Sequence, residues 1–106
     1  MLLLLDENLP KRLKQDFPGH LVFTVKDRGW NGLKNGALLE KLIENKFDCL
    51  ITFDKNLRHQ QNFRKYPIAV FVMNARINKY SVLTKLTPKI IKLLKEPLPK
   101  GPIEIS

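Results

Sequence analysis

Leu-Leu-Leu-Leu-Asp at residues 2–6 and Cys-Leu-Ile-Thr-Phe-Asp at residues 49–54 decide the fold, because each is a short apolar run that ends on an aspartate. A continuous apolar run of this length is typical of a strand whose two faces are both covered, as in a parallel sheet. In parallel α/β sheets, ligands gather at the carboxyl ends of the strands. The pattern therefore predicts an acidic site formed by Asp6 and Asp54, although an aspartate in this place is also common as a turn or helix-cap residue.

Strand and helix patterns alternate along the remainder of the chain. Asn8 and Asn35 are of the residue type that caps helices, and each precedes an apolar stripe with helical spacing, the second of which includes Ile43. This alternation predicts an α/β fold, a three-layer α/β/α sandwich around a mostly parallel sheet of four to five strands. Besides 2–5 and 49–53, the expected strands are 21–25, 68–73 and 103–105; the expected helices are 9–17, 35–45, a short one within 54–67, one from about 79 and one at 87–95.

Size and composition indicate one domain that spans residues 1–106, with a short tail from residue 96. The net charge of +9 favours nucleic acid, an acidic protein segment or an anionic membrane surface as partner. No apolar stretch reaches the ~18 residues of a transmembrane helix, and the run before Asp6 is too short for a signal peptide. Since the lone Cys49 has no partner for a disulfide, we expect a soluble cytoplasmic protein.

Carboxylates gathered at the end of an apolar strand repel one another and call for a cation. Mg²⁺ and Mn²⁺ prefer oxygen ligands, and Mg²⁺ commonly takes only one or two protein carboxylates. Asp6 and Asp54 are therefore the expected metal ligands. Glu7 and Asp27 are further candidate catalytic carboxylates, with a loop ion pair to Arg28 as the alternative role of Asp27.

A basic and amide-rich segment follows Asp54. Its cationic side chains can hold phosphates close to a metal site, although a solvated surface loop has the same composition. The candidate nucleic-acid-binding residues are Lys55, Arg58, Arg64 and Lys65.

Three motifs occur in order along the chain: Leu-Leu-Asp-Glu-Asn-Leu-Pro at 4–10, Val-Lys-Asp-Arg-Gly-Trp at 25–30 and Leu-Ile-Thr-Phe-Asp-Lys-Asn-Leu at 50–57. Together they resemble the short bacterial PIN-like proteins classed as a domain of unknown function, over roughly residues 2–75. PIN domains are Mg²⁺- or Mn²⁺-dependent ribonucleases of α/β/α architecture, and many are toxins of toxin–antitoxin pairs. The resemblance implies that Asp6 and Asp54 are the matching metal-site carboxylates.

The sequence departs from that family at the start of the helix expected at 35–45. Family members generally carry an acidic residue there, whereas this chain has Asn35 and Ala37 and no carboxylate before Glu40. This departure leaves open whether the site is active.

Three functions are consistent with these features. The first is a metal-dependent endoribonuclease, with RNA as substrate and, as the resemblance implies, an acidic antitoxin as partner. The second is a PIN-like module that binds RNA or an acidic protein and cuts weakly or not at all. The third is a phosphohydrolase of free nucleotides, which we rank lowest because a broad basic surface suits a polymer better than a small anion. Homodimer formation stays open in all three.

Overall fold

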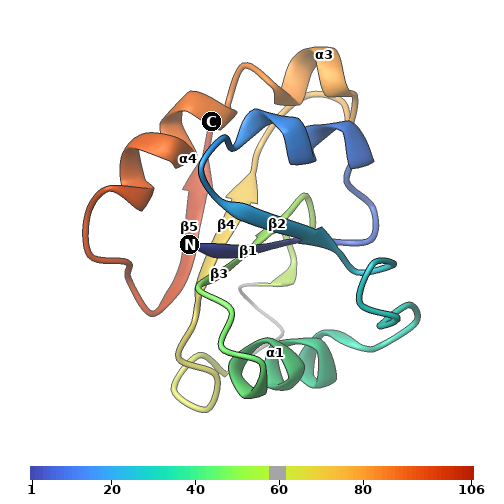
Figure 1. Ribbon diagram of the computed structural model, residues 1–106, viewed down its shortest axis with the longest axis vertical. Helices are drawn as coiled ribbons and strands as arrows, with labels where there is room; N and C mark the ends of the chain where they lie inside the picture. The colour runs from blue at the N-terminus through green and yellow to red at the C-terminus, as the bar shows by residue number, and fades with distance from the viewer. Residues whose placement is uncertain (58–61) are drawn as a thin grey trace.

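The computed structural model describes residues 1–57 and 62–106, which form a five-stranded sheet (Figure 1). All neighbouring strands run parallel, in the order β2-β1-β3-β4-β5, so the predicted α/β fold with a parallel sheet is confirmed. The strands are β1 (Leu2–Leu5), β2 (Leu21–Thr24), β3 (Cys49–Thr52), β4 (Ala69–Met73) and β5 (Gly101–Ile105), and the helices are the 3₁₀ helix η1 (Lys11–Asp16), α1 (Asn35–Glu44), α3 (Tyr80–Leu83) and α4 (Thr87–Leu94).

The two strands that lead into the aspartates, β1 and β3, are neighbours inside the sheet. Their residues are apolar on both faces because both faces are covered: residues 3–5 and 49–52 are all buried. The register pairs Leu5 with Ile51, and the backbone N–H of Asp6 donates to the carbonyl of Ile51 at 2.9 Å. Asp6 therefore stands directly beside the end of β3.

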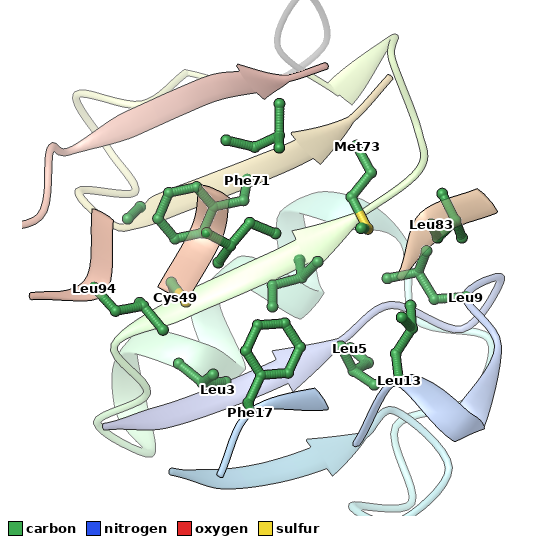
Figure 2. Packing of buried hydrophobic residues seen from close by; sticks show 14 residues of the cluster. Leu3, Leu5, Leu9, Leu13, Phe17, Cys49, Phe71, Met73, Leu83 and Leu94 are labelled. Atoms are coloured by element: carbon green, nitrogen blue, oxygen red, sulfur yellow. The ribbon is translucent and has the colours of Figure 1, made fainter. Parts of the chain in front are cut away.

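Alternate residues of each strand belong to two separate hydrophobic clusters. Leu3 and Leu5 pack with apolar residues of η1, α3 and α4, and Figure 2 shows this cluster between the sheet and those elements. Leu4 packs instead with Leu38 and other residues of α1, which lies on the opposite side of the sheet in Figure 1. Both faces of the sheet are thus buried, so polar residues lie at the ends of its strands.

Several predicted helix details are wrong. The first helix is a short 3₁₀ helix whose cap position is Pro10; Asn8 does not cap it, and its carbonyl accepts a hydrogen bond from Asn78 at 2.6 Å. Asn35 is the first residue of α1 and not its cap, and no side chain caps that helix. Ile43, expected in the buried stripe, is 38% exposed.

The C-terminal segment is more ordered than a tail. The predicted edge strand begins two residues earlier than expected, at Gly101, and pairs with β4 along its whole length. Pro102 fits this place because an edge strand leaves one row of N–H groups without a partner strand. The short helix expected within 54–67 includes residues 58–61, which lie outside the described residues. No helix within the described ranges is long and apolar enough to cross a bilayer.

Candidate metal and nucleic-acid site

Asp6 and Asp54 lie at the carboxyl ends of neighbouring strands and are connected by the hydroxyl group of Thr52. Thr52 Oγ1 donates to Asp6 Oδ2 at 2.6 Å and accepts from the backbone N–H of Asp54 at 3.0 Å. The threonine is fully buried, whereas both aspartates are half-buried. Because a hydroxyl has a single hydrogen, these two bonds fix its orientation. The structure thus brings together the two residues that the sequence singled out.

Each oxygen of Asp54 has a different partner. Oδ1 accepts the backbone N–H of Asn56 at 2.9 Å, which is the local turn-forming role of an aspartate after a strand. Oδ2 accepts a hydrogen bond from Nδ2 of Asn35, the first residue of α1, at 3.3 Å. Asp54 therefore combines the local turn role, on one oxygen, with a contact to α1, on the other.

Asn35 occupies the corner of the site where the family resemblance implies a carboxylate. Ala37 and Glu40 are both exposed further along α1. Across residues 1–57 and 62–106, no group of three or more acidic, histidine or cysteine side chains is arranged to hold a metal ion. The side chains described at this corner that could bind a metal are therefore the carboxylates of Asp6 and Asp54 and the amide of Asn35.

Asp27 lies apart from this pair. Its Oδ2 accepts from Lys14 Nζ at 2.7 Å and from the backbone N–H of Thr24 at 2.8 Å. The hydrogen bond from Lys14, followed by that from Thr24, lowers the pKa of Asp27 to about 2. Asp27 thus ties η1 to the end of edge strand β2, which resembles the predicted alternative of an ion pair, with Lys14 in the place of Arg28.

Glu7 is exposed and turns toward the loop after β2. Its Oε1 accepts from Asn31 Nδ2 at 3.3 Å, and Asp6, Glu7 and Asn31 all line a cavity of about 170 Å³. Glu7 is therefore next to the Asp6 carboxylate but on the side away from Asp54.

The predicted basic residues separate into two groups. Lys55 follows Asp54 directly, at the carboxyl edge of the sheet. Arg64 and Lys65 follow Phe63, whose Cβ would lie 3.9 Å from a side chain added at Gly101, the first residue of β5. They are therefore placed near the amino-terminal edge, away from the aspartates. Arg58 lies outside the described residues.

Several segments at the carboxyl edge carry cationic side chains, of which the sequence predicted Lys55 alone as a binding residue. All are exposed, and they are spread over the segments that follow β1, β2, β3 and β4. Their sequence positions are far apart, so no local basic run reveals them; the parallel topology brings them to one edge. We call them the edge cations: Lys11, Lys26, Lys34, Lys55, Arg76 and Lys79.

Thr52 is a site residue that the sequence reasoning missed. It sits inside an apolar run, where a threonine is usual for a strand. The spacing Thr52-Phe53-Asp54 carries a signal, because a threonine hydroxyl can accept from a backbone N–H two residues on. The family resemblance marks the position of Asn35 as one of two where a carboxylate is usual, but nothing local in the sequence indicates its contact with Asp54.

Comparison with protein-family models, with curated proteins and with solved structures finds no match to this chain.

Proposed function

We propose that this protein is a Mg²⁺- or Mn²⁺-dependent ribonuclease with the three-layer arrangement and the acidic site of a PIN-like domain. The observation that carries the proposal is the Thr52 hydroxyl, which donates to the Asp6 carboxylate and accepts from the Asp54 backbone N–H, so that both residues are tied to one point of the edge where parallel sheets bind ligands.

The donor set suits a hard divalent cation. Asp6 and Asp54 offer carboxylate oxygens, and the Asn35 side chain offers a carbonyl oxygen if its amide is reversed from the assigned orientation. Two carboxylates are within the number that Mg²⁺ commonly takes from a protein. When bound, such an ion supplies Lewis acidity at a phosphodiester. Thr52 holds Asp6 in place before the ion arrives, which lowers the cost of ordering its ligands.

The edge cations support a polyanionic substrate. They lie on segments that follow four of the strands, at the same sheet edge as the two aspartates, which suits a chain of phosphates better than a single small anion. The phosphate backbone would lie across the carboxyl edge, with a scissile phosphate facing Asp6 and Asp54. An acidic antitoxin-like protein would compete for the same cations.

The direct test is cleavage of single-stranded RNA by the purified protein with and without Mn²⁺. We expect Asp6→Asn and Asp54→Asn each to reduce metal-stimulated cleavage by about 100-fold or more, because each removes a charged ligand at the reacting phosphate. Glu40→Gln is the matched control, since Glu40 is an exposed carboxylate on α1. Equal cleavage by the wild type and both aspartate variants would refute the assignment.

One observation favours a second function, a module that binds RNA or an acidic protein without cutting it. The amide of Asn35 contributes no charge where a third carboxylate would strengthen metal binding, and it donates to Asp54. We expect Asn35→Asp to raise Mn²⁺ affinity by roughly tenfold, because affinity increases with the number of charged ligands. Titration calorimetry measures the change.

The same variant separates the two functions. Cleavage by the wild type that increases in Asn35→Asp supports the ribonuclease, and cleavage that appears only in Asn35→Asp supports the binding module. Ala37→Asp is the control, since Ala37 is exposed and lies on the same helix. An unchanged Mn²⁺ affinity in Asn35→Asp would contradict the placement of this residue at the metal corner.

A further inference from the structure

The cavity beside Asp6 is a separate feature of the carboxyl edge. It has a volume of about 170 Å³ and lies between the segments that follow β1 and β2. Ligand pockets for drug-sized molecules span roughly 300–1,000 Å³, so this one has room for a single small group. Because Asp6 belongs both to the cavity and to the proposed metal pair, a group in the cavity would be adjacent to whatever the aspartates bind.

The lining combines an apolar floor with polar groups. Leu9 and Val25 are 7% and 2% exposed, and they form part of the wall together with Thr24. Glu7 and Asn31 provide a carboxylate and an amide, already joined at 3.3 Å. Bases of single-stranded RNA are recognised by hydrogen bonds to their edges, in addition to stacking on aromatic or guanidinium planes. The cavity supplies the edge-directed polar groups beside an apolar wall.

Two of the edge cations, Lys11 and Lys26, also line the cavity. Lysine is a point charge without acceptor capacity, and it binds phosphate oxygens without reading the sequence. A nucleotide with its base in the cavity could thus have its phosphate beside these lysines and the next phosphate beside Asp6. The two lysines in the lining therefore favour a nucleotide, which carries a phosphate, over an uncharged ring as the ligand of this cavity.

The chemistry of Glu7 determines which base fits. An ionised carboxylate accepts hydrogen bonds and donates none. Within the described chain Asn31 is the one side chain that donates to it, through Oε1, so the carboxylate retains acceptor capacity. Exocyclic amino groups, such as N4 of cytosine, are donors that pair with Glu, whereas O4 of uracil is an acceptor.

We propose that this cavity is a subsite for a nucleobase that carries an exocyclic amino group, with Glu7 as the specificity-determining residue. The proposal rests on the proposed function in one respect, that RNA is the ligand of this edge. It requires neither a bound metal nor cleavage.

The test is a titration with CMP and with UMP, which differ at position 4 in the amino group and the carbonyl oxygen. The fluorescence of Trp30, the single tryptophan, reports binding because its neighbour Asn31 lines the cavity. We expect CMP to bind at least about fivefold more tightly than UMP. In Glu7→Gln, whose amide both donates and accepts, the ratio should fall close to one. Glu40→Gln, the matched control on α1, should keep the wild-type ratio.

Equal affinities for the two nucleotides, a ratio unchanged in Glu7→Gln or no binding of either nucleotide would each overturn the subsite. Measurement without divalent metal, and again in Asp54→Asn, keeps the result independent of catalysis. If the protein cleaves RNA but binds CMP and UMP equally, the subsite proposal alone is refuted. If it distinguishes CMP from UMP but does not cleave RNA, the subsite is supported and the ribonuclease proposal is refuted.

Discussion

At the carboxyl end of β3, the buried hydroxyl of Thr52 forms hydrogen bonds with both Asp6, which follows β1, and Asp54, which follows β3. Thr52 is fully buried, so removal of its oxygen leaves Asp6 Oδ2 and the Asp54 N–H each short of a partner. Such losses cost about 1–3 kcal/mol for a buried polar group. We expect Thr52→Val, which keeps the shape, to lower the free energy of unfolding by about 2 kcal/mol in urea denaturation.

Thr52→Ser provides the control, since it retains the hydroxyl and removes a methyl group. A loss of stability in Thr52→Ser as large as that in Thr52→Val would assign the effect to packing and not to the hydrogen bonds. Metal affinity offers a second measurement, because a freed Asp6 should bind Mn²⁺ more weakly. An unchanged affinity would show that Thr52 does not position the site.

The positions of single residues could be predicted from the sequence where the residue directly follows a strand. Asp6 and Asp54 follow apolar strands, and the parallel register places both at one edge. The place of Asn35 could not be predicted, because the contact with Asp54 depends on how α1 approaches the sheet. The places of Arg64 and Lys65 near the amino-terminal edge could not be predicted either, since they depend on contacts with β5, which is distant in the sequence.

At the scale of elements, a hydrogen-bonded cluster joins η1 to the C-terminal helices. Asp16, the last residue of η1, accepts from Tyr80 of α3 and from Thr84, which follows α3, both at 2.6 Å. Thr87 of α4 donates its single hydroxyl hydrogen to the Thr84 carbonyl at 2.7 Å, and its oxygen lies 3.2 Å from Asp16. Since η1 and α3 are each shorter than a stable isolated helix, tertiary contacts must hold them in place.

Asp16→Ala is expected to destabilise the protein by about 2–3 kcal/mol, because it removes a half-buried carboxylate that accepts two hydroxyl hydrogen bonds. Urea denaturation measures the loss, and hydrogen exchange should localise it to α3 and the start of α4. Glu44→Ala, at an exposed carboxylate of α1, should have little effect. Equal losses in the two variants would show that the cluster does not bind η1 to these helices.

The elements that sequence patterns predicted best are those with the most uniform environment. β3 and β4 are buried throughout and β1 is buried except at Leu2, so hydrophobicity alone locates them within one or two residues. The start of the first helix was misplaced because the pattern around Leu9 and Leu13 is compatible with both an α-helix and a 3₁₀ helix. β5 was predicted too short, since Gly101 and Pro102 are unfavourable strand residues that β4 nevertheless pairs.

At the scale of the whole molecule, cationic side chains occur at both edges of the sheet, but we expect only those at the carboxyl edge to contact RNA. The edge cations follow parallel strands whose carboxyl ends share one sheet edge with the aspartates, whereas Arg64 and Lys65 lie near the opposite edge. If RNA lies across the carboxyl edge, the two groups contribute differently to the salt dependence of binding. Each neutralised phosphate on a single strand contributes a slope of about −0.7 to the logarithm of affinity against the logarithm of salt concentration.

We expect the double variant Lys34→Gln with Lys55→Gln to weaken RNA binding and to reduce the magnitude of this slope by about 1.4, the share of two phosphate contacts. The double variant Arg64→Gln with Lys65→Gln lowers the net charge equally, and it should leave the slope near the wild-type value. Binding is measured by fluorescence anisotropy of a labelled oligonucleotide over a series of salt concentrations, without divalent metal. Equal slopes in the two variants would mean that RNA responds to the total charge of the protein and not to its carboxyl edge. A larger effect of Arg64 and Lys65 would move the binding surface to the amino-terminal edge and separate it from Asp6 and Asp54.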